Sequence, residues 1–265
     1  MNKVFSFLLA GAFIFGISCT GGQKKTTEQA EEKSAAVEET VGPNELTQKE
    51  KEEGWVLLFD GKTSAGWHGY GHKPFPANWE IVDGTLHCKG SGRGEAGAEE
   101  GGDIVSDKAY SNFRLKLEWK ISEGGNSGVF YLGQEDPKYD KIYYTAPEMQ
   151  VLDNERHPDA RAGKDGNRMA GSLYDLIPAK PQNAKPAGEW NSIEIEVFKG
   201  SVWHRQNGET VLEYHLWTDE WNQLVANSKF PEFNPDFANV AQSGVFALQD
   251  HGDDVWYRNI KILAE

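Results

Sequence analysis

NFRLKLEWK, at Asn112–Lys120, alternates apolar and charged side chains over its whole length. A period of two predicts a β-strand with one face in a core and the other in water. Antiparallel sheets commonly bury one face and solvate the other. This stretch therefore indicates an antiparallel sheet, with Phe113, Leu115, Leu117 and Trp119 facing the core.

Strand signals recur along the rest of the chain. Trp190–Phe198 alternates in the same way, and Val202–Tyr214 contains Asn207-Gly208, a strong hairpin-turn signal. Many short strands separated by Gly, Asn and Asp turns, with no long amphipathic helix, predict an all-β antiparallel sandwich. One short helix is expected at Glu220–Lys229.

Ala146–Asn154, APEMQVLDN, carries polar side chains in an otherwise apolar strand. Glu148 and Gln150 share one face, and the residues alternating with them face the core. Asp153 would also face the core, unless a one-residue bulge returns it to the polar face. The pattern is typical of acid, base and hydrogen-bonding groups lining a cleft. A sheet with one solvated face is the alternative.

The first residues predict a secretion signal. A short positive start precedes an apolar run, Val4–Ile17, that is too short for a membrane span. Cleavage would leave Cys19 at the N-terminus for lipid attachment, and ordinary signal cleavage nearby is the alternative. We expect residues 1–19 to be a lipoprotein signal. The mature protein is expected to be extracytoplasmic, anchored by its lipid in the cell envelope, in the periplasm or at the outer membrane.

Thr20–Glu53 predicts a disordered linker, because it holds almost no aliphatic bulk. The folded domain is therefore expected at Gly54–Glu265. If Cys19 is lipidated, Cys88 has no intrachain partner, so the domain is not held by a disulfide.

Composition narrows the choice of ligand. The formal net charge of −14 argues against a nucleic-acid partner. Nine Trp and nine Tyr suit an uncharged polar ligand such as a sugar, whose C–H surfaces stack on aromatic faces. The sequence contains no dinucleotide fingerprint, phosphate-binding Gly loop, zinc-type Cys or His spacing, or Gly-x-Ser-x-Gly motif.

An ordered set of short motifs extends from Gly54 to the end of the chain. Its members are Gly54–Gly61 with Trp67, Trp79–Leu86, Asn126-Ser127-Gly128, Glu148-Met149-Gln150, Gly188–Asn191, Asn207-Gly208, Leu248–Gly252 and Arg258-Asn259-Ile260. In this order they resemble the 3-keto-disaccharide hydrolase family. The resemblance implies a concanavalin A-like jelly-roll sandwich of two antiparallel sheets. It also implies a secreted protein or lipoprotein of a Bacteroidetes-type bacterium that acts on glycosides oxidised at C3. From the chemistry of such a substrate alone, we expect an upstream oxidoreductase that forms the ketone.

The implied substrate explains which groups the enzyme needs. A ketone at C3 acidifies the hydrogen at C2, so a base can remove it and form an enediolate. The C1 leaving group departs by elimination, and water then adds across the double bond. This lyase-then-hydration route gives net hydrolysis. It requires a base near C2, hydrogen-bond donors to the enolate oxygen and an acid for the leaving group.

Nine side chains are candidates for this site. The predicted catalytic residues are Glu148, Asp153, His157 and His251, and the predicted substrate-binding residues are Asn126, Gln150, Tyr174, Gln249 and Arg258. Structural roles remain open for several of them. They are a turn for Asn126 and His251, a loop cap for Asp153, a solvated loop position for His157, a surface salt bridge for Arg258, and the core for Tyr174. Trp67, which is not one of the nine, is likewise either a core residue or an aromatic platform for a sugar.

A metal and two other functions also remain open. A divalent ion could join His157, His251, Glu148 and Asp153 and stabilise an enediolate. A conventional retaining glycosidase is the first alternative, because Glu148–Asp153 resembles the two-carboxylate strand of jelly-roll glucanases, although Gln150 replaces the middle acid. A non-catalytic carbohydrate-binding module is the second, since the fold does not determine the function.

Overall fold

The computed structural model describes residues 41–93 and 102–265. The strands are β1 (Val56–Leu57), β2 (Trp67–Gly69), β3 (Trp79–Val82), β4 (Thr85–Cys88), β5 (Ile104–Ser106), β6 (Phe113–Ile121), β7 (Asn126–Gly133), β8 (Glu148–Leu152), β9 (Asn191–Phe198), β10 (Ser201–Gln206), β11 (Glu209–His215), β12 (Val245–Leu248) and β13 (Val255–Ala264). The helices are α1 (Gln48–Glu53), α2 (Asp219–Ala226) and α3 (Phe230–Phe233), with 3-10 turns η2 (Ile142–Tyr144) and η3 (Pro158–Arg161).

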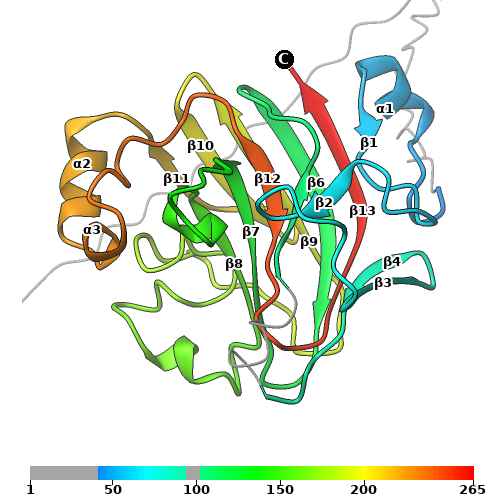
Figure 1. Cartoon of the computed structure of the whole chain (residues 1–265), viewed down its shortest axis with the longest axis horizontal. Coiled ribbons are helices and arrows are strands. Elements are labelled where there is room, and N and C mark those ends of the chain that lie inside the picture. Colours follow the sequence, from blue (N-terminus) through cyan, green and yellow to red (C-terminus); the bar gives the residue numbers. More distant parts are fainter. Residues whose placement is uncertain (1–40, 94–101) are drawn as a thin grey trace, which may run out of the picture. The chain divides into compact units, whose positions relative to one another are not determined.

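The strands form two antiparallel sheets that pack face to face (Figure 1). One has the order β11-β10-β9-β6-β13-β4-β3, with β1 added on β13, and the other has the order β2-β5-β12-β7-β8. This arrangement confirms the predicted all-β jelly-roll sandwich. Strand β6 confirms the alternation read from the sequence, since every second side chain along it is buried.

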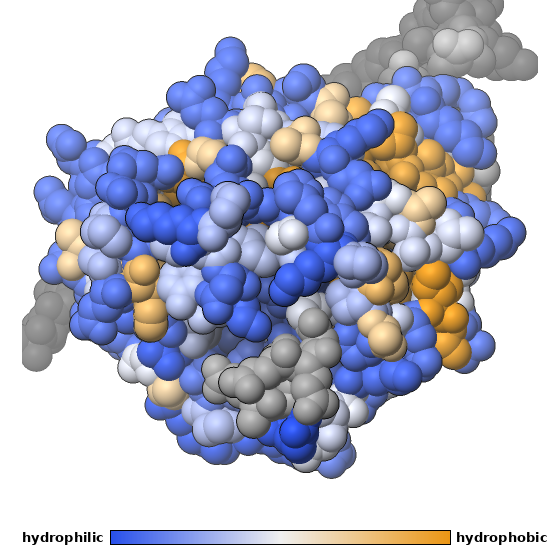
Figure 2. Space-filling view, viewed as in Figure 1, coloured by the Kyte–Doolittle hydropathy of each residue, from blue (hydrophilic) through white to orange (hydrophobic). Residues whose placement is uncertain are grey.

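The core lies between the sheets. Both sheets contribute its largest fully buried side chains, among them Trp119, Tyr131, Tyr257 and Phe246. Burying a large apolar side chain is worth about 1.5–3 kcal/mol, so this layer supplies the main stabilisation. Figure 2 shows a mostly hydrophilic outer surface on the face viewed, with hydrophobic residues in small groups.

Turn chemistry agrees with the predicted hairpin. Strands β10 and β11 pair up to Gln206 and Glu209. Asn207 and Gly208 form the turn with φ values of 50° and 86°. Two positive φ values in succession are those of a type I′ turn, which matches the twist of the strands.

The five-stranded sheet is buried on both faces. Every residue of β7 and β8 is buried. One face joins the core between the sheets. A second apolar cluster, which includes Tyr70, Phe130, Ile142 and Ala247, covers part of the other face. The polar side chains of β7 and β8 on this outer face are therefore largely removed from water.

The folded unit begins before the predicted boundary at Gly54. Helix α1 lies inside the predicted linker, capped by Thr47 and Glu50 in a reciprocal capping box. Glu50 forms an ion pair with Lys261 on β13. The amide N–H of Asn259 donates to Asn44 Oδ1 at 2.9 Å. The linker prediction is therefore wrong for these residues, because contacts with β13 order a segment that has no apolar stripe.

The predicted signal segment, the lipid attachment site Cys19 and the linker up to residue 40 lie outside the described residues. In the ranges that the structure describes, none of the helices has the length and apolar character needed to cross a membrane.

Candidate active site

A cavity of about 400 Å³ opens on the outer face of the five-stranded sheet. Ligand-binding pockets commonly have this size. Six of the nine predicted site residues line it: Asn126, Glu148, Gln150, Tyr174, Gln249 and His251. Residues that the sequence analysis did not identify complete the wall, among them Lys229, Asp103, Asp250 and Lys141.

Glu148 is one of three buried acids that line the cavity, with Asp103 and Asp250, and 8% of its surface is exposed. It begins β8 opposite Phe130, and its carboxyl group packs over Gly128 of β7. A Cβ added at Gly128 would overlap Glu148 Oε1, so only glycine leaves room for this carboxyl group. Burial raises the pKa of Glu148 to about 8, although the nearby Lys229 acts to lower it. A carboxyl group with this pKa can exchange a proton near neutral pH.

The long irregular segment after β8 makes Glu148 an interior residue. The N–H of Gly171 donates to the carbonyl of Gln150 at 2.8 Å, and the N–H of Tyr174 donates to the carbonyl of Glu148 at 3.0 Å. These bonds cover the edge of β8 and bring the Tyr174 side chain to the cavity. The segment after β8 is therefore part of the site.

Tyr174 connects two charged groups. Its hydroxyl donates to Asp159 Oδ2 at 3.0 Å and accepts from Lys229 Nζ at 3.2 Å. The Lys229 ammonium also lies 4.4 Å from the centre of the Tyr174 ring. Burial lowers the pKa of Lys229. The cavity thus places a cation, held by Tyr174, in the same space as Glu148.

The amide side chains in the cavity present acceptor atoms. Asn126 Oδ1 and Gln249 Oε1 are buried, and neither has a hydrogen-bond partner among residues 41–93 and 102–265. An unsatisfied buried acceptor costs about 1–3 kcal/mol. A ligand hydroxyl entering the cavity could satisfy each. Gln150 differs, because its Oε1 accepts from the N–H of Val151 at 3.1 Å.

His251 and His157 come together at one side of the cavity, but only His251 lines it. Their rings lie 6.1 Å apart, and Asn126 Nδ2 lies 3.2 Å from His251 Nε2. Asp253 is the third member of this group, and the possible ligand atoms lie within 4.8 Å of one another. The predicted metal set is corrected accordingly: Asp253 joins the histidines in place of Glu148 and Asp153.

This histidine group fits a divalent ion only in part. Two imidazoles and a carboxylate are suitable donors. However, His157 Nδ1 accepts from the N–H of Asp159 at 3.2 Å, which places the proton of the neutral ring on Nε2. If His157 bound the ion through Nε2, the proton of its neutral ring would have to move to Nδ1. The hydrogen bond from the Asp159 N–H to Nδ1 would then be lost.

The structure does not bring Asp153 to the cavity. Its carboxylate accepts from the N–H groups of Gly124 at 2.7 Å and Glu155 at 3.0 Å and pairs with Arg156. Burial acts to raise the pKa of Asp153, but these partners lower it below its ordinary value. The group caps a loop, as the structural alternative proposed, so the geometry does not support a catalytic base.

Arg258 is also remote from the cavity. Its Nε donates to Glu118 Oε2 at 2.7 Å, and its guanidinium lies 4.0 Å from the centre of the Trp190 ring. Both contacts lie within the eight-stranded sheet and its margin. The substrate-binding prediction for Arg258 is corrected to a surface ion pair. Trp67, which is 5% exposed, packs in the core and is no sugar platform.

Comparison with known families identifies the domain that holds this cavity. Residues 54–263 match the model of the 3-keto-alpha-glucoside-1,2-lyase-like domain. The chain belongs to this family. The match includes all nine predicted site residues and confirms the resemblance that the ordered motifs indicated.

Individual relatives agree with the family match. The 3-keto-disaccharide hydrolase of Bacteroides thetaiotaomicron is 46% identical over 288 aligned positions, which cover 99% of each chain. A solved structure of a proposed glycosyl hydrolase from Parabacteroides distasonis is 32% identical, with a TM-score of 0.74, covering 84% of this chain and 100% of its own. A second solved structure of a proposed glycosyl hydrolase from the same organism is 27% identical, with a TM-score of 0.61. The match covers 80% of this chain and 99% of that one.

Proposed function

We propose that this family member cleaves 3-keto-glycosides and that Glu148 removes the proton at C2. The family and the 46% identical hydrolase make it a glycoside-cleaving enzyme. One observation carries the assignment to Glu148: it is a buried carboxyl group with a pKa of about 8 that lines the cavity. A base of this strength can act near neutral pH.

In the proposed reaction, Glu148 takes the C2 proton and the electron pair forms an enediolate with the C3 ketone. The enediolate then re-forms the ketone as the bond from C1 to the leaving oxygen breaks, which leaves a double bond between C1 and C2. The leaving oxygen takes up a proton. Water adds its hydroxyl to C1 and a proton to C2, so the products are those of hydrolysis.

The other cavity residues bind and polarise the substrate. Asn126 Oδ1 and Gln249 Oε1 accept hydrogen bonds from sugar hydroxyls, because they have no other partner among the described residues. Lys229, held against Tyr174, places positive charge where the enediolate develops. A divalent ion held by His157, His251 and Asp253 would supply further stabilisation of this kind.

The cellular setting forms part of the proposal. The predicted signal and Cys19 support an extracytoplasmic, lipid-anchored protein of the periplasm or outer membrane. The substrate chemistry requires a separate oxidoreductase that introduces the C3 ketone.

The test compares a 3-keto-glucoside with the matching unoxidised glucoside, each carrying deuterium at C2. Full-length protein should cleave only the keto compound and release the deuterium to water. Glu148→Gln should lose this exchange together with cleavage, whereas Glu118→Gln, on the other sheet, should retain both. Repeating the assay with a chelator and then with added Mn²⁺ measures the metal dependence.

Two outcomes would overturn the proposal. Cleavage of both glucosides with deuterium retained would indicate a conventional glycosidase. Binding of the keto compound without cleavage, with and without added Mn²⁺, would indicate a binding module. Asp153, the second carboxylate of the predicted glycosidase alternative, does not line the cavity.

A further inference from the structure

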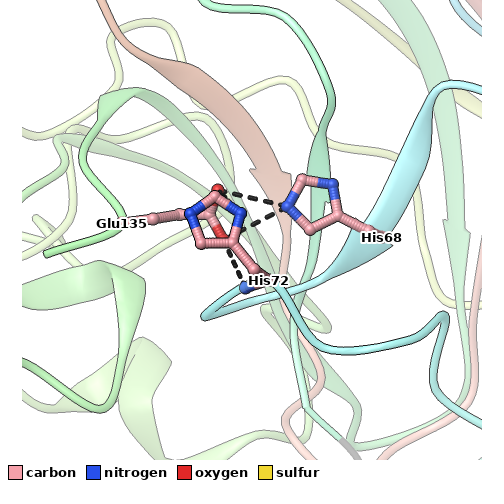
Figure 3. Close-up of side chains that lie close together, drawn as sticks. All are labelled: His68, His72 and Glu135. Atoms are coloured by element: carbon pink, nitrogen blue, oxygen red, sulfur yellow. Dashed lines mark hydrogen bonds and ion pairs between the residues drawn. The ribbon is translucent and has the colours of Figure 1, made fainter. Parts of the chain in front are cut away.

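A second cluster of metal-ligand side chains lies at the opposite edge of the five-stranded sheet. Figure 3 shows His68 of β2, His72 of the following loop and Glu135, which follows β7, pointing toward one another. Their possible ligand atoms lie within 4.8 Å of one another. None of the three lines the cavity.

The strand register separates this cluster from Glu148. His68 pairs with Val105, Val105 with Ala247, Ala247 with Phe130, and Phe130 with Glu148. Paired residues share a face, so His68 and Glu148 lie on the same side of the sheet. Four strand spacings of about 4.8 Å place them about 19 Å apart.

The distances within the cluster fit a tetrahedral metal ion. Glu135 Oε2 lies 3.1 Å from His68 Nε2 and 3.5 Å from His72 Nδ1. Zinc bonds of about 2.0–2.1 Å in a tetrahedron hold the ligand atoms about 3.4 Å apart. Both distances from Glu135 are therefore close to the spacing that zinc requires, and the two histidine ligand atoms lie within 4.8 Å of each other.

Asp107 sets the orientation of the His68 ring. Its Oδ1 lies 2.7 Å from His68 Nδ1, so Nδ1 carries a proton and donates to the carboxylate. In a neutral ring, Nε2 then presents a lone pair to the Glu135 carboxylate. Two acceptors facing each other at 3.1 Å require a cation between them, either a proton or a metal ion. A carboxylate bonded to the outer nitrogen of a ligand histidine is the usual second layer of a zinc site.

The backbone holds the other two ligands in place. Glu135 Oε1 accepts from the N–H groups of Gly71 at 2.9 Å and His72 at 3.0 Å, which turns Oε2 toward the histidines. Gly69 and Lys73 exchange two backbone hydrogen bonds of 2.9 Å and close the loop. His72 has a φ of +58°, an uncommon conformation for a residue other than glycine.

We propose that His68 Nε2, His72 Nδ1 and Glu135 Oε2 bind a divalent transition metal of the zinc type. Imidazole nitrogen selects such ions over Mg²⁺ and Ca²⁺, and the fourth position is left for water. The ion joins the loop after β2 to the segment that continues from Glu135 to Lys141 and Tyr143 in the cavity wall. This role is structural and does not depend on the proposed reaction.

His87 provides a matched control. It also lies between two carboxylates, with Nδ1 3.2 Å from Glu80 Oε1 and Nε2 2.7 Å from Asp254 Oδ1. Its ring stacks on Trp256, and no second imidazole approaches it among the residues that the structure describes. It therefore reproduces the histidine between two acids without the metal geometry.

The experiment measures Zn²⁺ bound per full-length chain after chelator treatment and dialysis, together with the dissociation constant by calorimetry. His72→Asn removes an exposed ligand and keeps a residue that tolerates positive φ. It should remove one Zn²⁺ per chain or weaken its binding at least about 100-fold. Asp107→Asn should weaken binding about 10- to 100-fold. His87→Gln should change neither quantity.

A thermal measurement supplies a readout that does not use activity. Zn²⁺ should raise the melting temperature of the wild type and of His87→Gln more than that of His72→Asn, because ligands stabilise the state that binds them. Equal Zn²⁺ content and affinity in wild type and His72→Asn would overturn the proposal. Loss of the Zn²⁺ in His157→Ala but not in His72→Asn would also overturn it.

Discussion

The outer faces of the two sheets both carry acidic side chains, but they differ in what those side chains contact. On the eight-stranded sheet, Arg205 Nη1 bonds to Glu194 at 2.9 Å and to Glu196 at 2.8 Å. On the five-stranded sheet, Glu148 is buried, and Asn126 Oδ1 has no hydrogen-bond partner among the described residues. One face satisfies its own polar groups, whereas the other presents them to a cavity.

This difference separates structural charges from candidate functional groups. Ion pairs near the surface contribute about 0–1 kcal/mol each and leave little capacity to bind a ligand. Buried polar groups without hydrogen-bond partners reduce the stability of the free protein, and a bound substrate can supply the missing hydrogen bonds. The contrast predicts that equivalent substitutions on the two faces have unequal effects.

The largest expected effect is on catalysis. Glu148→Gln should lower kcat/KM for a 3-keto-glucoside roughly 10²- to 10⁴-fold, the usual contribution of a general base. Glu118→Gln removes an acid from the paired face and should leave kcat/KM nearly unchanged. Steady-state kinetics on both variants provide the measurement. Equal losses in the two variants would mean that the contrast between the faces has no functional meaning.

The second effect concerns the dependence of stability on pH. Burial raises the pKa of Glu148 from 4.5 to about 8, so the unfolded state ionises first as the pH rises. The free energy of unfolding should therefore fall between pH 4.5 and 8, by on the order of 5 kcal/mol from this group. Glu148→Gln should remove that fall.

Urea denaturation at several pH values measures this effect, and the variant should gain stability relative to the wild type as the pH increases. Asp103, whose pKa is raised by burial to about 7, contributes a similar fall that persists in Glu148→Gln. A stability difference that stays constant from pH 5 to 8 would contradict the buried state of Glu148.

The third effect tests how the sheet positions the acid. Gly128→Ala would place a methyl group on the Glu148 carboxyl group and displace it. Displacing a catalytic group by about 1 Å can cost about 100-fold in rate. Gly42→Ala is the control, because the nearest atom to its added Cβ is 3.6 Å away. Full activity in a folded Gly128→Ala variant would show that Glu148 need not occupy this position.

A smaller effect is expected from the amide groups. Asn126→Ala or Gln249→Ala removes one acceptor for a substrate hydroxyl, worth about 0.5–1.5 kcal/mol. We expect kcat/KM to fall up to about 10-fold, mainly through KM. Removing the partner hydroxyl from the substrate should produce no further loss in the variant. Independent losses from the two changes would argue against that contact.

The smallest effect is predicted for Arg258. Arg258→Gln breaks the ion pair with Glu118 and should reduce stability by about 1 kcal/mol or less, with unchanged kcat/KM. Denaturation and kinetics on the same preparation provide the test. A large rise in KM would restore the substrate-binding role that the sequence suggested.

The sequence predicted those features that depend on neighbouring residues. Alternation located β6 and β9, and Asn207-Gly208 located the hairpin, because side-chain direction and turn conformation are local properties. The same periodicity placed Glu148 and Gln150 on one face of β8. The predicted polar face is the one that lines the cavity.

Other features required partners distant in the chain. Asp153 and Arg258 could not be assigned correctly, since the Gly124 N–H and the Glu118 carboxylate that engage them come from other elements. Lys229 and Asp253 carried no local signal of a role in the site. His68 and Glu135 are 67 positions apart and meet only because the chain folds back over the sheet.

By itself, the sequence determined the strands, their buried and polar faces, the family and six of the cavity-lining residues. The tertiary structure alone decided which polar groups pair with other side chains and which remain available to bind a ligand. The physical reason is that the free energy of a buried charge depends on the solvent and charges around it, and strands and loops far apart in the sequence supply these. Glu148 and Glu118 both lie in strands with buried neighbours. Only the fold makes Glu148 a candidate base and pairs Glu118 with Arg258.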